Sequence, residues 1–346
     1  MRKIVTLAIS LTITLLIYSQ NEITQIHSAH SAYSENTEKT VQIPDSNFHF
    51  LTIFVMKSVK PIDWESPSSL VRSTFKGYKA KMFHPGQYLI GHMAARLESP
   101  IADGIRYSAM VSASMREKRV LVMKEKVGLG ILGIAMNGKL DDEKDILKDL
   151  KLSSRQNKLA YVKYQISEES ARKIILFMEG FSATVNGNSS PSNYYGGAFW
   201  PRYFDEGAGC SAYGMSMVDV AGLTGAEHND WKIVVNIPLR LVGGELNQGK
   251  KVSKKEISKT KSWVNDNDTV QEYIHFSIYD PSIIYEWIIE KRNNKEDEYY
   301  ENDQENGIPG LYSDKRYIKP SELDLVFIPR PEPSLFIEHF ERKRVK

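Results

Sequence analysis

The 346-residue chain contains a single cysteine, Cys210, whose thiol could act as a nucleophile. It follows the turn GAG and begins the stretch CSAYGMSMVDVAGL, which we expect to be helical. A helix N-terminus stabilises a thiolate through its unpaired backbone N–H groups and its dipole. Two interpretations follow: a reactive thiol, or a small apolar residue that faces the core beside Gly214 and Met217.

Two glycines precede the cysteine, Gly207 and Gly209. We expect them to let the backbone turn sharply, because glycine adopts conformations that other residues avoid. Such a turn would bring backbone N–H groups close to a substrate carbonyl, as an oxyanion site requires.

A thiol nucleophile needs a base, usually histidine, within hydrogen-bond reach. His92 is the best candidate of eight histidines, because it interrupts the apolar strand PGQYLIGHMAARLES directly after Gly91. Its alternative interpretation is a structural strand histidine. Polar terminal segments hold His27, His30 and His339. His49 starts a strand and His84 precedes a proline. His228 lies in an expected surface turn and His275 in an apolar strand.

The elements around these residues can be predicted from their patterns. Folded structure is expected from about Phe48, with a first strand in HFLTIFVMKS and a hairpin between the His92 strand and RYSAMVSAS. Another strand is expected in KLAYVKYQI. The following helix is capped by Ser167 and carries an apolar stripe of Ala171, Ile174, Ile175 and Met178.

A long loop from Ser182 to Gly209 joins this helix to the cysteine, and loops of that length in a compact domain are often functional. Its aromatic residues either line a cleft or fix the loop to the core. Beyond the cysteine helix we expect a strand in WKIVVNIPLRLV. The lysines of GKKVSKKEISKTK are interpreted as a solvated loop, and EYIHFSIY and LDLVFIP as edge strands or a small extension.

The N-terminus predicts export. Arg2 and Lys3 precede an apolar run from Ile4 to Tyr18, which is the layout of a secretory signal peptide over residues 1–19, with cleavage near residues 29–32 as an alternative. A flexible tether is expected over 20–45, a folded domain over 46–245 and a C-terminal extension over 246–346. The expected location is secreted or periplasmic, without stable membrane insertion.

Composition indicates an ordinary globular protein, with 41% hydrophobic and 25% charged residues. The net charge of +2 does not favour nucleic acid as a partner. The sequence contains no zinc spacing, phosphate-cradling glycine motif or serine-nucleophile elbow, so no metal and no cofactor are inferred.

Two segments together, GQYLIGHMAARLE and GCSAYGMSMVDVAGL, resemble the circularly permuted branch of the NlpC-type, papain-like superfamily. This branch includes cell-wall amidases and peptidases and the lecithin retinol acyltransferase group. His92 matches its strand histidine and Cys210 its helix-opening cysteine. The resemblance covers about residues 85–223 and implies an α+β fold, in which an antiparallel sheet packs against the cysteine helix.

The chain departs from the family pattern in two places. Gly209 precedes the cysteine, where many relatives have Asn or Asp. The polar residue that commonly orients the histidine is also not evident. Glu98 lies too far along the same strand, and the expected hairpin places Ser112 opposite His92, or Val111 after a one-residue slip.

The resemblance implies a secreted thiol hydrolase that cleaves an amide or peptide bond, with cell-wall peptide as the candidate substrate. Cys210 would attack the carbonyl and His92 would transfer the proton. Two alternatives stay open: an acyltransferase or lipid thioester-forming enzyme of the same fold, and an exported binding or surface-interaction protein without catalysis.

Overall fold

A computed structural model describes residues 48–344, except 85, 185–188, 267–269, 295–297 and 321–323. The predicted signal peptide over residues 1–19 and the predicted tether over residues 20–45 lie outside the described residues. From Phe48 onward the described residues belong to one compact unit. Among them, no helix is both long and apolar enough to cross a bilayer.

The main sheet has six strands in the order β10-β11-β6-β1-β2-β3. Their bounds are β1 His49–Met56, β2 His92–Ser99, β3 Gly104–Ser108, β6 Leu159–Ile166, β10 Glu301–Glu305 and β11 Ile308–Asp314. Neighbours are antiparallel, except that β11 runs parallel to β6. The sheet is therefore mixed where an antiparallel one was expected, and the chain has a mixed α and β fold.

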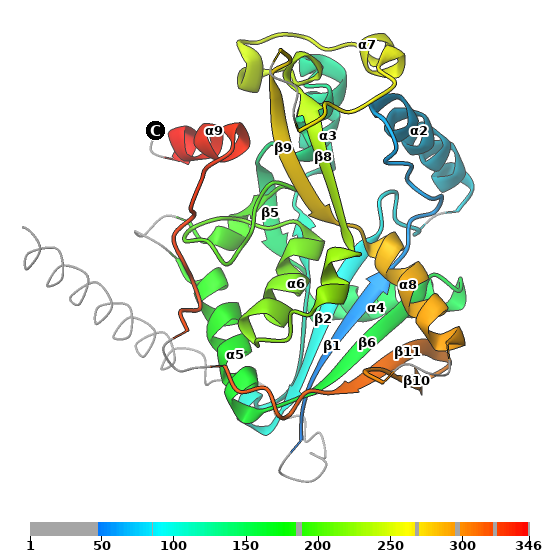
Figure 1. Cartoon of the computed structure of the whole chain (residues 1–346), viewed down its shortest axis with the longest axis vertical. Coiled ribbons are helices and arrows are strands. Elements are labelled where there is room, and N and C mark those ends of the chain that lie inside the picture. Colours follow the sequence, from blue (N-terminus) through cyan, green and yellow to red (C-terminus); the bar gives the residue numbers. More distant parts are fainter. Residues whose placement is uncertain are drawn as a thin grey trace, which may run out of the picture. The chain divides into compact units, whose positions relative to one another are not determined.

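Helices cover both faces of this sheet (Figure 1). Because side chains alternate along a strand, Leu51 and Ile53 of β1 face one core cluster while Phe54 faces another. The first cluster includes residues of α5 (Glu168–Ser182), α6 (Cys210–Val220) and α8 (Pro281–Asn293), and the second includes residues of α4 (Glu143–Arg155).

Several local predictions are confirmed. Strands β2 and β3 form the expected hairpin around the short turn Pro100–Ala102. Helix α5 begins after Ser167, whose side-chain oxygen accepts a hydrogen bond from the backbone N–H of Ser170. The cysteine helix α6 begins at Cys210, as its sequence indicates.

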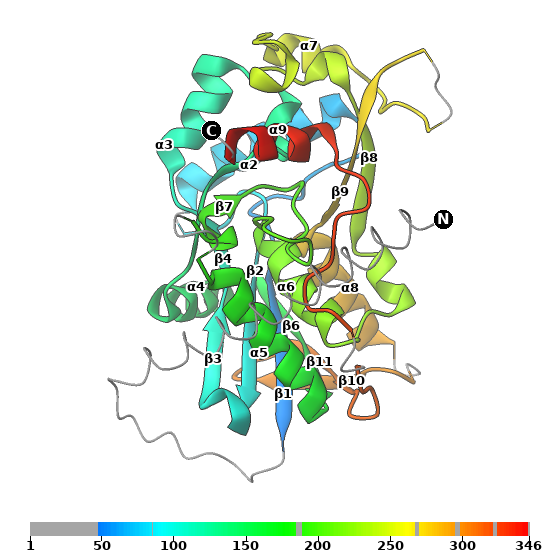
Figure 2. The same ribbon diagram turned by 90° about the vertical axis from the view of Figure 1, so that its left-hand side faces the viewer.

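A second part of the unit has two small sheets, β4-β5-β7 and β8-β9 (Figure 2). The strands are β4 Met110–Ser112, β5 Met136–Leu140, β7 Tyr194–Tyr195, β8 Lys232–Pro238 and β9 Tyr273–Tyr279. The helices around them are α2 Pro67–Phe83, α3 Met115–Arg119, which a π-helical turn Val120–Glu125 continues, α7 Lys254–Lys259 and α9 Leu335–Arg344. Short 3-10 turns occur at Leu129–Leu132, Pro191–Asn193, Ala226–Asn229, Leu239–Leu241 and Glu245–Asn247.

The segment predicted as a C-terminal extension contributes to both parts. It supplies β9 to the β8-β9 pair, β11 and β10 to the main sheet, and α8 to the first core cluster. Its residues 286–293 form the second half of α8, whose Ile288 is fully buried. The apolar piece LDLVFIP forms no named strand, although Ile328 makes an isolated bridge to Tyr203.

Helix α6 lies close to β2 because Gly214 has no side chain. A Cβ at position 214 would stand 2.5 Å from the sulfur of Met93 on β2 and 3.0 Å from its Cγ. Gly214 follows Cys210 by one helical turn, so both residues lie on the same face of the helix. The close approach therefore also sets the position of the cysteine relative to the strand.

We expect Gly214→Ala to destabilise the protein by about 2 kcal/mol, since an added methyl group in a packed core forces its neighbours to shift. Chemical denaturation measures the change. In a double-mutant cycle, Met93→Ala should make the Gly214→Ala step less costly, because it removes the side chain that the new Cβ meets. Additive effects of the two substitutions would contradict this account of the contact.

Candidate functional site

The structure brings Cys210 and His92 together. Each is the first residue of its element, Cys210 of α6 and His92 of β2. The imidazole and the backbone N–H of Met93 both lie close enough to the thiol to lower its pKa. Both side chains are nearly buried, with 8% of Cys210 and 5% of His92 exposed. Both residues are therefore largely shielded from solvent.

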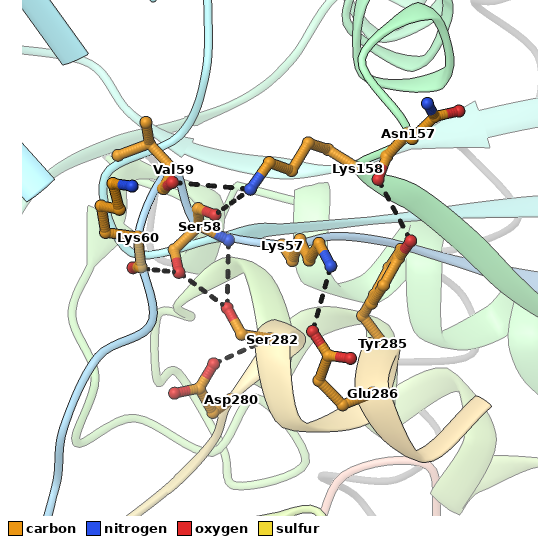
Figure 3. Close-up of polar contacts among 10 residues, drawn as sticks. All are labelled: Lys57, Ser58, Val59, Lys60, Asn157, Lys158, Asp280, Ser282, Tyr285 and Glu286. Atoms are coloured by element: carbon orange, nitrogen blue, oxygen red, sulfur yellow. Dashed lines mark hydrogen bonds and ion pairs between the residues drawn. The ribbon is translucent and has the colours of Figure 1, made fainter. Parts of the chain in front are cut away.

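His92 is held in place by its neighbours on β1 and α8. It pairs with Met56, the last residue of β1. The chain directly after Met56 is fixed to the start of α8, since the backbone N–H of Ser58 donates to Ser282 Oγ at 3.0 Å and Lys57 pairs with Glu286 at 3.0 Å (Figure 3). This network fixes the end of β1, against which β2 begins.

Tyr88 orients the imidazole ring through stacking. Its ring lies parallel to that of His92, with centroids 4.6 Å apart and an interplanar angle of 18°. The Tyr88 hydroxyl donates to Asp149 of α4. Burial, followed by the bond to Asp149, raises the pKa of Tyr88 far above its ordinary value, so the phenol stays neutral. Tyr88 lies within the segment PGQYLIGHMAARLES that was predicted as a strand, but the observed strand β2 begins only at His92.

The predicted candidates for a third polar residue do not contact His92. Glu98 forms an ion pair with Arg96 at 2.8 Å. The β2-β3 ladder ends at the pair Ala95 and Ser108, after which β4 leaves β2 to pair with β5, so Ser112 lies opposite Gly138. Within the described part of the chain, His92 is positioned by an aromatic ring and by strand pairing, and no hydrogen bond joins it to a third side chain.

Tyr195 of β7 completes the immediate surroundings of the thiol. Its hydroxyl lies near both the backbone N–H and the sulfur of Cys210, and both groups affect the pKa of the phenol. Burial, together with the thiolate charge, raises the pKa of Tyr195 well above its ordinary value, so the hydroxyl keeps its proton at neutral pH. A hydroxyl donor therefore lies beside the first backbone N–H of the cysteine helix.

Gly207 and Gly209 act differently from the prediction. Neither has a positive φ, and both lie against the strand segment that holds Tyr195. A Cβ at Gly207 would stand 2.1 Å from the carbonyl oxygen of Tyr194, and the N–H of Ala208 donates to that same oxygen at 3.0 Å. The glycines let the backbone before Cys210 pack on β7, which places Tyr195 next to the sulfur.

The electrostatic environment favours the thiolate. Burial by itself raises the pKa of the Cys210 thiol, but the positive charge and hydrogen bond of His92, with the Met93 N–H and the Ser211 hydroxyl, lower it to about 7. The Ser211 oxygen lies 3.9 Å from the sulfur. A substantial fraction of the thiol is thus ionised at neutral pH, which is the state that acts as a nucleophile.

A cation also lies near the thiol. Lys118 of α3 places its Nζ 5.0 Å from the centre of the Tyr195 ring. Burial lowers the pKa of Lys118, whereas the negative charge of Cys210 raises it. Lys118 could not be found from the sequence, because nothing in the MREKR stretch links it to Cys210.

The other aromatic residues of the long loop mostly fix it to the core. Tyr194 and Phe199 pack edge-on against Phe340, and Trp200 packs against Tyr279. The loop is therefore attached mainly by aromatic burial, and Tyr195 is the member that reaches the thiol.

The structure contradicts the sequence prediction for one further histidine and agrees with it for another. His228, predicted as a surface turn residue, is fully buried, with its ring edge-on to Trp231 and its Nε2 3.4 Å from the Tyr164 hydroxyl. His275 is a strand residue whose Nδ1 lies 3.0 Å from Asn236 Oδ1, as a structural role predicts.

Two cavities elsewhere do not include the thiol or the imidazole. One, of about 710 Å³, lies between the chain after β1 and helix α8, and the other, of about 360 Å³, lies beside α3. Within the described ranges, no group of three or more His, Cys, Asp or Glu side chains is arranged to hold a metal ion.

Comparisons with known proteins found no matching family model, no matching curated protein and no matching solved structure.

The rate of Cys210 alkylation by iodoacetamide should rise with pH to a half-maximum near 7, because only the thiolate reacts. In His92→Ala the midpoint should move to or above about 8.5, since the main group that stabilises the thiolate is gone. His275→Gln is the matched control and should leave the profile unchanged. An identical profile in the His92 variant would show that the imidazole does not activate the sulfur.

Proposed function

We propose that the protein is a thiol hydrolase that cleaves an amide or peptide bond, with peptide of the cell wall as its candidate substrate. The observation that carries this proposal is the contact between Cys210 and His92, at which the thiol has a pKa of about 7. A buried cysteine that serves only as a small apolar residue would have a raised pKa. The activated thiol therefore favours the hydrolase over a binding protein without catalysis.

The reaction follows from these groups. The Cys210 thiolate adds to the substrate carbonyl carbon and forms a tetrahedral intermediate with a negatively charged oxygen. The His92 imidazolium gives its proton to the leaving amine as the C–N bond breaks, which leaves a thioester on Cys210. Water then adds to the thioester while His92 accepts its proton, and the carboxylic acid and free thiolate are released.

Tyr195 supports stabilisation of the intermediate. Its hydroxyl lies beside the backbone N–H of Cys210, and both groups can donate a hydrogen bond to an oxygen placed between them. A substrate oxygen that took over these bonds would gain two donors in a site that excludes most water, where such bonds contribute strongly to catalysis. Tyr195 is thus assigned as an oxyanion donor together with the Cys210 N–H.

Lys118 indicates the kind of substrate. A cation beside the thiol favours peptides that carry a carboxylate near the scissile amide, because an opposite charge in a partly desolvated site is attracted strongly. Peptides with free carboxylates, such as those of the cell wall, meet this requirement. The neighbours of the sulfur are aromatic and polar, which favours such peptides over an alkyl chain.

The arrangement also supports the papain-like assignment. A helix that opens with the cysteine packs on a strand that begins with the histidine, and the strand comes first in the chain. The acyltransferase alternative shares the thioester step and differs in the acceptor, which would be an amine or alcohol in place of water.

Incubation of the protein with soluble cell-wall peptide fragments should release new amino groups, and rapid quenching should trap an acyl group on Cys210 that mass spectrometry locates. Cys210→Ala and His92→Ala should abolish release, with His275→Gln as the matched control. Release that survives Cys210→Ala would refute the proposal. Transfer of the acyl group to an added amine without hydrolysis would assign the acyltransferase instead.

Tyr195→Phe should lower kcat by about 10²-fold, in the range seen when one oxyanion donor is removed, with little effect on KM. The packing of the ring is kept, so a folded protein is expected. The control is Tyr194→Phe, the neighbouring residue, whose hydroxyl bonds Ser189 at 3.2 Å and not the thiol. Equal activity of the two variants would remove Tyr195 from the oxyanion site.

Lys118→Gln should raise KM for a peptide with a free carboxylate and leave KM unchanged for the same peptide with that carboxylate amidated. The ratio between the two substrates is the measurement, so a general loss of activity does not mimic the result. Arg119→Gln, at the exposed neighbouring position, serves as the matched control.

A further inference from the structure

A core cluster separate from the two that pack on the main sheet is surrounded by three segments, which together form what we call the basic end: α2, residues 115–126 and residues 250–261. Each anchors the same core cluster with an apolar residue, Leu70 of α2, Leu121 of the second segment and Ile257 of α7. Figure 1 shows α2, α3 and α7 together in the upper part of the view. The basic end is therefore one continuous region built around a shared core.

The charge of the basic end differs from that of the chain as a whole. Helix α2 has four basic and no acidic residues, residues 115–126 have five basic and two acidic ones, and residues 250–261 have six basic and one acidic. The excess of positive charge is twelve, although the net charge of the whole chain is +2. The remainder of the chain is thus acidic, and the basic end is suited to an anionic partner.

The exposed surface of α2 is also unusually apolar. The helix buries small residues, Ser68, Ser69, Ser73 and Gly77, together with Pro67 and Leu70. It exposes Phe75, Tyr78, Met82 and Phe83, of which Met82 is 73% and Phe83 79% exposed. A helix at a water-facing surface normally has the opposite arrangement. The large apolar side chains lie on the same surface as Lys76 and Lys79.

Residues 115–126 repeat this combination. Met115 and Met123 are each 69% exposed, Val122 is 47% exposed, and basic residues lie between them. Together, α2 and this segment hold seven of the eighteen large apolar side chains that are exposed among the described residues. Two short segments thus concentrate exposed apolar groups where positive charge is also concentrated.

We propose that the basic end docks on the surface of an anionic phospholipid bilayer. Lysines and arginines pair with the headgroups, while the aromatic and methionine side chains enter the boundary between headgroups and acyl chains. A nucleic acid would satisfy the charge but would leave Met82, Met115 and Met123 exposed to water. The proposal concerns peripheral binding and does not depend on the proposed catalytic function.

Flotation with vesicles tests the proposal on the full chain. Vesicles of phosphatidylcholine with phosphatidylglycerol should carry the wild type, and the combined substitution Phe75→Ser, Tyr78→Ser, Met82→Ser and Phe83→Ser should lower the partition coefficient at least about tenfold. Tyr317→Ser with Leu325→Ser is the matched control, because these side chains are also exposed but lie outside the basic end.

A local probe separates this surface from every other part of the chain. Met82→Cys and Met123→Cys, each in a Cys210→Ser background, are labelled with an environment-sensitive fluorophore. The emission should shift to the blue with anionic vesicles, and the shift should weaken with salt, because screening reduces attraction between exposed charges. A label at Tyr317→Cys should not respond.

Two results would overturn the proposal. One is the absence of a shift at Met82 and Met123 with anionic vesicles under conditions in which a lipid-bound control peptide shifts. The other is displacement of the protein from vesicles by a single-stranded oligonucleotide together with unchanged binding of the quadruple serine variant. That second result would assign the basic end to a polyanion without a role for the apolar side chains.

Discussion

The contact between the start of α6 and the start of β2 is the constraint on which the candidate site depends. Cys210 can meet His92 only if the helix lies close to the strand, and Gly214 permits this approach one turn further along. The same approach brings the backbone N–H of Met93 near the sulfur, where it helps to lower the pKa of the thiol. A packing requirement within the core and the chemistry of the thiol are therefore set by one helix–strand distance.

Burial has two opposite effects at this site. It disfavours the thiolate, because a charge loses its hydration, and it also strengthens the attraction between the thiolate and His92. The attraction prevails, since the pKa of Cys210 is lowered despite burial. The same burial shields the thiol from solvent. The lowered pKa and the shielding of the thiol thus both arise from its position between α6 and β2.

The parts of the fold with a local signal could be predicted from the sequence. The α5 cap at Ser167, the β2-β3 hairpin and the start of α6 each depend on residues close together in the chain. Tyr195 and Tyr88 could not be assigned to the site, because their roles arise from long-range packing. The orienting partner of His92 was sought as a polar side chain, and stacking of Tyr88 has no comparable sequence pattern.

Helix α2 was missed for a different reason, which bears on its role. Sequence patterns predict a helix from an apolar stripe that faces the core, whereas α2 turns its small residues inward and its aromatic residues outward. The parallel β6-β11 pair was also missed, because its strands lie about 150 positions apart in the chain. The pattern of α2 thus departs from that of a local amphipathic helix, whereas the β6-β11 pair depends on a contact between distant parts of the chain.

The segment 115–126 connects the two regions of interest. Lys118 lies over the ring of Tyr195 beside the thiol, while Met115 and Met123 of the same segment are exposed on the basic end. The segment is held to the core mainly by Leu121 and to β5 by the bond from the Asn137 N–H to Glu117 at 2.9 Å. A surface that binds the exposed methionines would therefore act on the segment that carries Lys118. The proposed docking surface and the surroundings of the thiol therefore share this one segment.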